Sequence, residues 1–193
     1  PRNPKEGMML KNGYTMYKGM KFKDLNVLSF DLETTGATID DNSFVLLISN
    51  TMRTSTGDIV RKLFAFDDYD TPELFIKDWC KWVRSQNPDV LLGHNIFGFD
   101  LPYLRQFCKN QTIDSLHLGR DASKLYFAKN PSKFRKDGYQ SYDYINVDCY
   151  GREIIDTMFL AFKFDIARKY ESYGLKQIIK QDVLENADRQ HND

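Results

Sequence analysis

The sequence predicts an α/β domain with a mixed central sheet, made of three antiparallel strands followed by parallel strands and flanked by helices. Three observations support this fold class. Apolar segments typical of strands come first and in close succession, later ones alternate with amphipathic helical segments, and the 193 residues, 41% of them hydrophobic, are enough for one buried core. We therefore expect residues 1–193 to form a single domain.

The first half of the chain contains the antiparallel part of the predicted sheet. Strands are expected at 26–33, 42–50 and 59–66, where apolar residues dominate. The last two are separated by "TSTGD", in which Gly57 and Asp58 favour a tight turn. That turn predicts an antiparallel pair.

Helices and buried strands alternate in the rest of the chain. Thr71 and Pro72 are typical of a helix start, and Asn87 followed by Pro88 is typical of a helix end. Beyond this helix, the apolar pattern predicts a buried strand at 89–95, a helix at 100–110, a second buried strand at 152–158, and helices at 158–170 and 172–181. This order is expected of parallel strands joined by helical crossovers.

The composition excludes several classes of protein. Lys plus Arg and Asp plus Glu both number 27, so net charge indicates neither a nucleic-acid nor a membrane partner, and any such surface has to be local. No apolar run approaches the roughly 18 to 20 residues of a membrane span, so no membrane association is expected. The cysteines Cys80, Cys108 and Cys149 lack CxxC or CxxH spacing, which favours apolar filler in a reducing, cytoplasmic compartment over disulfides or zinc.

Two carboxylates end the first predicted strand, in the stretch "LSFDLETTG". Because side chains alternate along a strand, Asp31 and Glu33 share one face while Leu28, Phe30 and Leu32 point to the other. In a chain of this composition, roughly 0.65 DxE sequences are expected by chance. The motif therefore becomes informative only through its position in the chain. The turn signal that follows places the pair at the carboxyl end of a strand, where open α/β sheets bind ligands.

The closeness of Asp31 and Glu33 predicts a metal site. Adjacent carboxylates repel each other, and without compensation the pKa of one would rise until it took up a proton. A divalent cation removes this conflict, and oxygen ligands of this kind favour Mg²⁺ or Mn²⁺. Two such ions about 4 Å apart are a common device for hydrolysing phosphodiesters, so two ions are expected in a complete site.

A third acidic residue, Asp100, lies in "GHNIFGFDLPYL", where a loop after a buried strand enters a helix. In isolation it is best explained as a helix N-cap, a position that Asp often fills. A functional role gains support from Asn95 and Phe99 and from the expected closeness of the strand that carries the acidic pair. Both explanations stay open on these residues alone. His94, single at the end of a buried strand, is expected to be structural.

These motifs resemble those of a known superfamily. "FDLETTG" resembles the first motif of the DEDD superfamily of 3′-to-5′ exonucleases, and "HNIFGFD" resembles the second. "IIDTM" and "YESYGLKQI" are similar to later elements of the proofreading domains of family B DNA polymerases and their free-standing relatives. The resemblance runs in order over residues 26–179. It implies an RNase H-like fold and hydrolysis of single-stranded DNA from its 3′ end.

The resemblance also implies metal ligands at matching positions. Asp31 would bridge two metal ions, Glu33 would bind the ion that activates the attacking water, and Asp100 would bind the second ion. The implied chemistry is in-line hydrolysis without a covalent nucleophile on the protein.

Contacts with DNA are implied in the same way. Thr34, Asn95 and Phe99 would hold the terminal nucleotides, Phe99 by sequence-tolerant packing on a base or sugar. Leu175 would touch the DNA strand, although Gly174 stands where the family usually has Ser or Thr.

The fourth acidic ligand of the family has no counterpart at the expected place. It belongs to a YxxxD or HxxxxD motif beyond "SYGL", whereas the YxxxD sequences of this chain, at 139–143 and 144–148, precede "IIDTM". Asp156 is not at a ligand position, and a hydrogen-bonding role is expected for it. The start at Pro1 and the polar end favour a fragment of a longer enzyme over a complete degraded one. Weak metal binding with residual or no nuclease activity is expected.

Residues 120–150 form a basic and aromatic insert. Such a composition is typical of surfaces that bind single strands, although a solvated basic loop would look the same. Family B polymerases have a hairpin in this general region that helps to separate primer from template. The resemblance therefore suggests a mobile β-hairpin at about 125–147.

The leading interpretation is a metal-dependent 3′-to-5′ exonuclease domain that acts on single-stranded DNA ends as a monomer, in a parent chain with or without a polymerase domain. One alternative is a nucleic-acid-binding or scaffolding domain that has lost cleavage, but clustered negative charge near phosphates argues against it. Another is an RNA 3′-to-5′ exonuclease, since nothing in the sequence reads a 2′-hydroxyl. A bacterial, archaeal or viral source fits these features.

Overall fold

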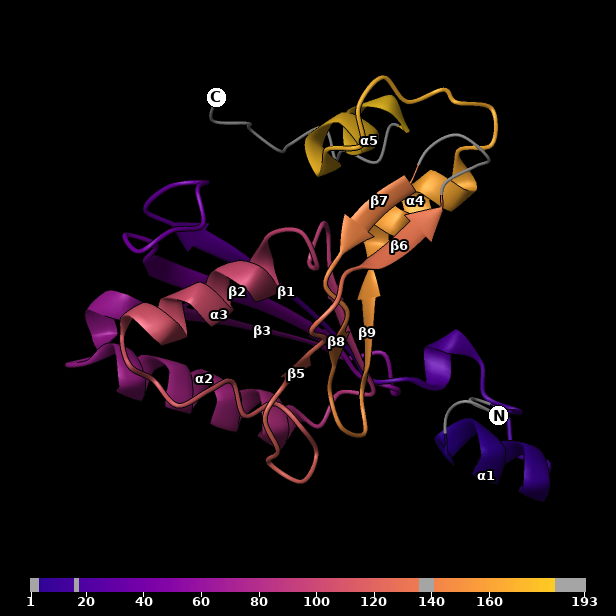
Figure 1. Cartoon of the computed structure of the whole chain (residues 1–193), viewed down its shortest axis with the longest axis horizontal. Helices are drawn as coiled ribbons and strands as arrows, with labels where there is room; N and C mark the ends of the chain where they lie inside the picture. Colours follow the sequence, from indigo (N-terminus) through magenta and orange to yellow (C-terminus); the bar gives the residue numbers. More distant parts are fainter. Residues whose placement is uncertain (1–3, 16–17, 136–140, 183–193) are drawn as a thin grey trace.

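The structure, a computed structural model, describes residues 4–15, 18–135 and 141–182 (Figure 1). The helices, including two 3₁₀ turns, are α1 (Pro4–Asn12), η1 (Phe22–Asp24), η2 (Phe66–Asp68), α2 (Pro72–Gln86), α3 (Asp100–Asn110), α4 (Thr157–Phe164) and α5 (Leu175–Gln181). The strands are β1 (Val27–Thr34), β2 (Val45–Arg53), β3 (Ile59–Ala65), β4 (Val90–Gly93), β5 (Tyr126–Phe127), β6 (Ser132–Arg135), β7 (Ser141–Tyr144), β8 (Val147–Asp148) and β9 (Glu153–Asp156).

A five-stranded mixed sheet forms the centre of the domain, in the order β3-β2-β1-β4-β9. β1, β2 and β3 pair antiparallel, whereas β1, β4 and β9 pair parallel. The turn between β2 and β3 contains Gly57 with φ at 94°, a conformation that suits glycine. The mixed sheet and the antiparallel pair predicted from the sequence are therefore confirmed.

The helix α2 begins and ends where the sequence predicts. The hydroxyl of Thr71 accepts a backbone N–H of the first turn at 3.3 Å, and Pro72 is the first helical residue. Asn87 ends the helix in the left-handed conformation. On the buried side, the indole N–H of Trp79 donates to the Oδ1 of Asn50 on β2 at 3.0 Å, which satisfies a polar group in the core.

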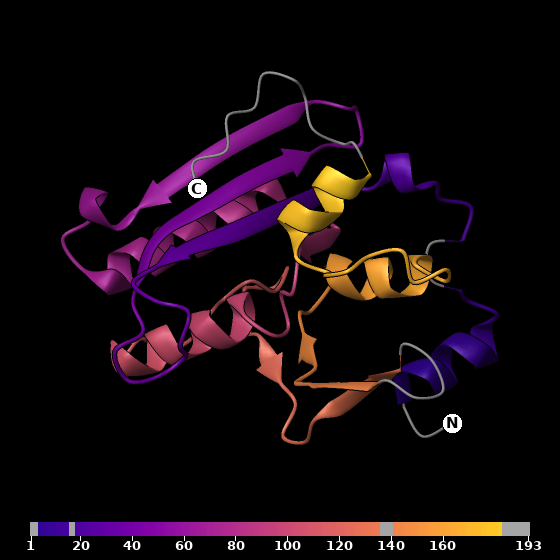
Figure 2. The same ribbon diagram turned by 90° about the horizontal axis from the view of Figure 1, so that it is seen from above.

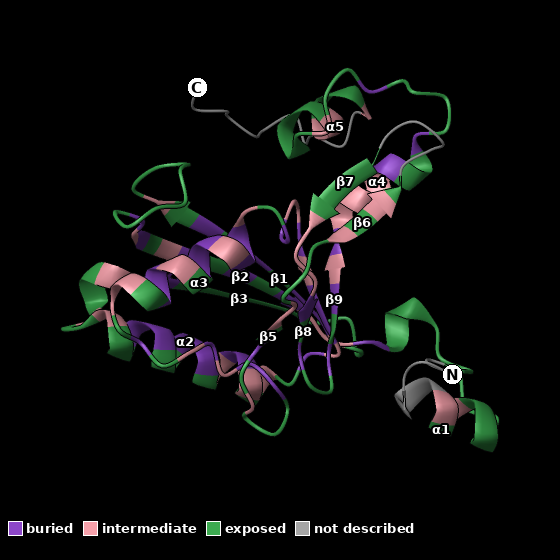
Figure 3. Cartoon of the chain, viewed as in Figure 1, coloured by how far each residue is buried: buried purple, intermediate pink, exposed green. Residues whose placement is uncertain are grey.

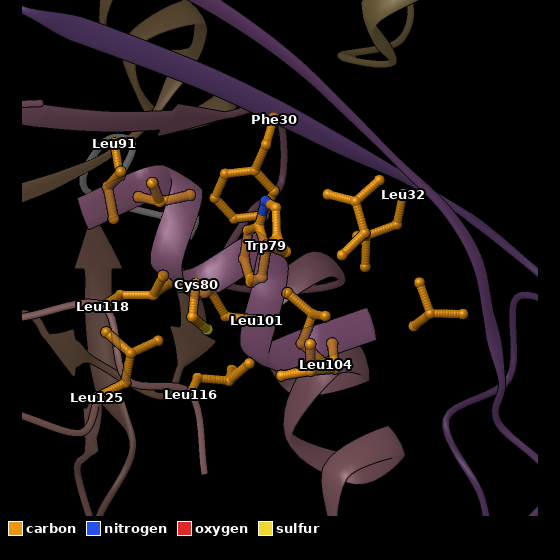
Figure 4. Close-up of a cluster of buried hydrophobic side chains, with 14 of the residues drawn as sticks. Phe30, Leu32, Trp79, Cys80, Leu91, Leu101, Leu104, Leu116, Leu118 and Leu125 are labelled. Carbon is orange, nitrogen blue, oxygen red and sulfur yellow. The ribbon is translucent and has the colours of Figure 1, made fainter. Parts of the chain in front are cut away.

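The main apolar core lies between the sheet and the helices α2 and α3 (Figure 4). Phe30 and Leu32 of β1 face Trp79 of α2 and Leu104 of α3, and the rings of Phe30 and Trp79 meet edge to face at 5.4 Å. In Figure 3 both helices are buried along one side and exposed along the other. The three cysteines are buried and free, as expected of apolar filler. This packing leaves one face of β1 for the core and the other for solvent.

The helix predicted at 158–170 is wrong in its extent, because α4 ends at Phe164. Asp165 is buried, and its carboxylate accepts the backbone N–H groups of Lys169 at 2.7 Å and Tyr170 at 3.1 Å. An Asp side chain that bonds nearby backbone groups competes with the helix in this way. The chain therefore turns before α5 begins.

β6 and β7 form a hairpin within the insert. Ser132 pairs with Tyr144 and Arg135 with Ser141, and Lys133 and Arg135 are exposed. The tip of the hairpin, residues 136–140, lies outside the described residues. Mobility of the hairpin stays a prediction.

Aromatic rings attach this hairpin to α4. Phe134 stacks on Phe159 with ring centroids 4.3 Å apart and an interplanar angle of 7°, and Tyr142 stacks on Phe162 at 4.5 Å and 13°. Tyr144 meets Phe159 edge to face at 5.1 Å. Three rings of the insert, which its composition suggested for base stacking, therefore pack against α4.

The N-terminal helix α1 lies on the side of the molecule away from α2 and α3, as Figures 1 and 2 both show. Across the described ranges, none of the helices is long and apolar enough to cross a membrane.

Candidate active site

β1 carries the acidic pair beyond its pairing with the parallel neighbour. Residues 27–29 pair with residues 90–92 of β4, so Asp31 and Glu33 extend past the point where β4 ends. Both side chains are exposed on the face opposite the core, as strand alternation predicts. The register with β2 then shifts, because Glu33 pairs with Leu47 and Thr34 with Val45.

The loop after β4 brings the second motif to the same edge of the sheet. Asn95 has a left-handed φ of 64°, and its carbonyl accepts the N–H groups of Gly98 at 3.0 Å and Phe99 at 2.8 Å. A Cβ on Gly98 would lie 2.2 Å from the Oδ1 of Asn95, so a larger residue there would displace the Asn95 side chain. The loop is thus a tight turn that leads straight into α3.

Asp100 is the first residue of α3, and its side chain is 2% exposed. Phe99 occupies the N-cap position. Within the described part of the chain, no side chain caps this helix and no group forms a hydrogen bond to Asp100 Oδ1. The N-cap explanation of Asp100 is therefore wrong. A buried carboxylate oxygen without a partner is costly to the fold, which favours a functional explanation.

The electrostatic surroundings of Asp100 are unfavourable for its negative charge. Its pKa is raised from 3.8 to about 7, mainly by burial and then by the negative charges of Asp31 and Asp156. Backbone N–H groups of Asp100 and Leu32 act in the opposite direction but do not balance these effects. The field of Asp31 at Asp100 shows that the two sequence motifs meet in space.

A divalent cation suits this arrangement. It would relieve the repulsion between Asp31 and Asp100 and give the free oxygen of Asp100 a partner, and carboxylate oxygens are the donors that Mg²⁺ and Mn²⁺ prefer. Among the described residues, no three His, Cys, Asp or Glu side chains are already close enough to hold a metal ion. The fold thus brings Asp31 and Asp100 into electrostatic range, while Glu33 stays exposed on the same strand face as Asp31.

Two further residues organise the loop behind Asp100. The buried carboxylate of Asp156 accepts the backbone N–H of Asn95, in the loop after β4, and that of Met158, in the first turn of α4, each at 2.9 Å. The ring of His94 is held between the hydroxyl of Thr157 at 3.0 Å and the carbonyl of Tyr173 at 2.7 Å, which supports the structural role expected for it. The position of Asp156 at a strand end indicates a hydrogen-bonding role, but the sequence does not show which groups it bonds.

The residues expected to hold DNA lie in two places. Thr34 and Phe99 are half-buried at the sheet edge, where the Thr34 hydroxyl donates to the carbonyl of Gly36 at 2.9 Å and the Phe99 ring lies 5.3 Å from that of Tyr103. Leu175 is 49% exposed and begins α5, two residues after Tyr173, whose carbonyl contacts the ring of His94 beside the second motif. The DNA contacts of these residues stay predictions.

Comparison with known proteins identifies the family. The model of the family "DNA polymerase family B, exonuclease domain" matches residues 11–178. The chain belongs to this family. The match confirms the family and the enzyme class, 3′-to-5′ exonuclease, that the motifs indicated.

Individual relatives of this exonuclease domain are much longer polymerases. It is 27% identical over 189 residues to the DNA polymerase delta catalytic subunit of Schizosaccharomyces pombe, covering 89% of this chain and 17% of that protein. It is 31% identical over 111 residues to a DNA polymerase of Archaeoglobus fulgidus, covering 56% of this chain and 13% of that protein.

A solved structure supports the fold. The family B DNA polymerase from the hyperthermophilic archaeon Pyrobaculum calidifontis matches 81% of this chain and 18% of its own chain, with a TM-score of 0.54 and 22% identity. The predicted RNase H-like fold is thereby confirmed.

Proposed function

We propose that this exonuclease domain removes nucleotides from the 3′ ends of single-stranded DNA, as a proofreading module that depends on divalent metal ions. The observation that carries the proposal is the buried oxygen of Asp100, which has no partner among the residues that the structure describes and lies in the field of Asp31, at the edge where parallel strands end. A domain that only bound nucleic acid would gain nothing from clustered negative charge beside phosphates. This argues against a scaffolding role.

Asp31, Glu33 and Asp100 are the residues that would hold the metal ions, with Asp31 shared between two. When bound, Mg²⁺ or Mn²⁺ would polarise the scissile phosphate and lower the pKa of the attacking water. Asp31 and Glu33 approach from the exposed face of one strand, whereas Asp100 approaches from the start of a helix packed in the core. Carboxylates on two rigid elements suit a site that must keep its geometry through catalysis.

The surrounding residues would hold the DNA end. Phe99, half-buried beside Asp100, offers part of its ring for packing on a terminal base or sugar, which does not depend on base identity. Thr34 and Asn95 would supply polar contacts at the same edge, and Leu175 would touch the strand from α5. Tolerance of any base is what a proofreading enzyme requires.

The fourth carboxylate expected in this family is not supplied by the aspartates near α5. Asp165 accepts backbone N–H groups, and Asp182 is held by Lys169 at 2.7 Å and by the hydroxyl of Tyr170. Within the described part of the chain, both are therefore engaged elsewhere. We infer that this chain by itself binds metal weakly and has low nuclease activity, because water and metal are incompletely positioned.

The names of the relatives suggest the setting of this activity. They are DNA polymerases, so we propose that the domain acts as a monomer inside the cell and in the same parent chain as a polymerase domain. Its substrate would then be the single-stranded 3′ end of a growing DNA strand.

The proposal is tested with an oligonucleotide labelled at either end and an excess of this chain. We expect slow shortening from the 3′ end that requires Mg²⁺ or Mn²⁺ and is lost in Asp31→Ala, because that variant lacks the shared ligand. Gel electrophoresis of the products over time gives the measurement. Shortening from the 5′ end, activity in the presence of a chelator, or full activity of Asp31→Ala would contradict the proposal, and equal cleavage of RNA would favour the RNA alternative.

A further inference from the structure

The carboxylate of Asp156 holds the loop that leads from β4 to α3. Asp156 is the last residue of β9, lies level with Gly93 of β4, and is 3% exposed. We propose that Asp156 is a positioning residue for the metal site. Its carboxylate fixes this loop and thereby sets the position of the Asp100 carboxylate. The inference rests on the proposed function, because it adds a residue to the same site.

Backbone N–H groups occupy both oxygens of Asp156. Oδ1 accepts from Asn95 and from Met158, each at 2.9 Å, and Oδ2 accepts from Phe97 at 3.3 Å. Both oxygens of Asp156 are thus engaged by backbone donors. This distinguishes Asp156 from Asp100, whose Oδ1 has no partner among the described residues.

The loop turns sharply at Asn95. Its φ of 64° lies in the left-handed region, which Asn adopts more readily than other non-glycine residues. The N–H of Phe97, two residues on, must also point back toward the strand ends to reach Asp156. Two hydrogen bonds to the Asp156 carboxylate therefore hold this turn against the strand ends.

Hydrogen bonds connect this loop to the first turn of α3. The N–H of Phe99 donates to the carbonyl of Asn95 at 2.8 Å, and the N–H of Leu101 donates to the carbonyl of Ile96 at 3.0 Å. These bonds lie on either side of Asp100 in the sequence. A shift of the loop at Asn95 would thus move the helix start and the Asp100 carboxylate with it.

Two substitutions separate the hydrogen bonds of Asp156 to the loop from its cap of α4 and from its negative charge. Asp156→Ser keeps a good N-cap for α4 but is too short to reach the loop. Asp156→Asn keeps one oxygen for Asn95 and Met158, yet it places an amide NH₂ against the N–H of Phe97. Both variants remove the negative charge, so a role that depends only on charge would affect them equally.

The test combines Mn²⁺ titration followed by electron paramagnetic resonance with amide hydrogen exchange measured by NMR, on the full 193-residue chain and under conditions where every variant is folded. For Asp156→Ser we expect the Mn²⁺ dissociation constant to rise about tenfold, as for other residues that support metal ligands. The amides of Asn95 and Phe97 should exchange at least about tenfold faster. Asp156→Asn should show about a threefold rise and faster exchange mainly at Phe97.

Asp89→Ser is the matched control. Asp89 precedes β4 at its opposite end, where its Oδ2 accepts the N–H of Asn26 at 2.8 Å and its Oδ1 accepts from the guanidinium of Arg120. Loss of these two contacts should lower stability without changing Mn²⁺ affinity. A role of Asp156 in stability alone would give the same result as this control.

The outcomes distinguish the inference from the proposed function. If the wild-type chain binds no Mn²⁺, the proposed function is wrong and the inference falls with it. If the wild type binds Mn²⁺ and Asp156→Ser binds it equally well, or the loop amides exchange at the wild-type rate, the inference alone is wrong. Equal losses in Asp156→Ser and Asp156→Asn would also overturn it, in favour of an effect of charge.

Discussion

Replacing Asp100 with asparagine will raise the free energy of unfolding of the metal-free protein by about 2 kcal/mol at about pH 8, and it will remove the stabilisation that Mn²⁺ gives the wild type. The first effect follows from the pKa of Asp100, which is raised from 3.8 to about 7 by burial and by its acidic neighbours. The full penalty of such a shift is roughly 4 kcal/mol. The expected gain is smaller because the buried amide of asparagine also needs partners.

The pH dependence has a definite sign. A folded-state pKa above the unfolded value means that the folded protein binds more protons, so this group lowers stability as the pH rises from about 4 to about 7. Asp100→Asn should flatten that part of the stability curve. Urea denaturation from about pH 4 to about pH 8, with and without Mn²⁺, gives the measurement.

Asp67→Asn provides the control, since Asp67 is exposed in η2 and loses the same charge. It should leave both the pH dependence and the response to Mn²⁺ unchanged. If Asp100→Asn instead destabilises the metal-free protein at about pH 8, or keeps its stabilisation by Mn²⁺, the account of Asp100 is incorrect.

Replacing Phe162 with alanine will destabilise the domain by about 3 to 5 kcal/mol and loosen the hairpin on α4 around Tyr142. Phe162 is 4% exposed, and its ring stacks on Tyr142 at 4.5 Å and meets Tyr173 edge to face at 4.4 Å. Its removal leaves a cavity beneath the hairpin and exposes apolar surface. Urea denaturation measures the stability, and hydrogen exchange of the β6 and β7 amides measures the release.

Leu160→Ala is the matched control in the same helix, because Leu160 is 55% exposed. It should change stability by no more than about 0.5 kcal/mol and leave the exchange of the hairpin amides as it is. Unchanged protection of those amides in Phe162→Ala would show that the stack of Tyr142 on Phe162 does not hold the hairpin.

The elements next to the site were predictable because local rules and tertiary packing agree there. The strand with Asp31 and Glu33 alternates between core and solvent as its sequence indicates. The helix α2 begins after Thr71 and ends at Asn87 because cap residues and apolar periodicity give the same bounds. The start of α3 at Asp100 was also predicted.

Other features depend on contacts between distant parts of the chain. No local signal shows that Asp100 is left without a cap bond and faces the charge of Asp31, since this follows from the pairing of β1 with β4. The partners of Asp156 are some 60 residues away, at Asn95 and Phe97. α4 ends early because the carboxylate of Asp165 accepts the backbone N–H groups of Lys169 and Tyr170. Helix propensity does not predict these bonds.

Carboxylates from β1 and α3 are expected to share one metal site. Mn²⁺ titration monitored by electron paramagnetic resonance, with the wild type compared with Asp31→Ala, Asp100→Asn and the exposed control Asp67→Ala, measures whether they do. We predict that the wild type binds Mn²⁺, that Asp31→Ala and Asp100→Asn each weaken binding by at least about tenfold, and that Asp67→Ala does not. Equal affinity of the wild type and Asp31→Ala, or of the wild type and Asp100→Asn, would contradict a shared site.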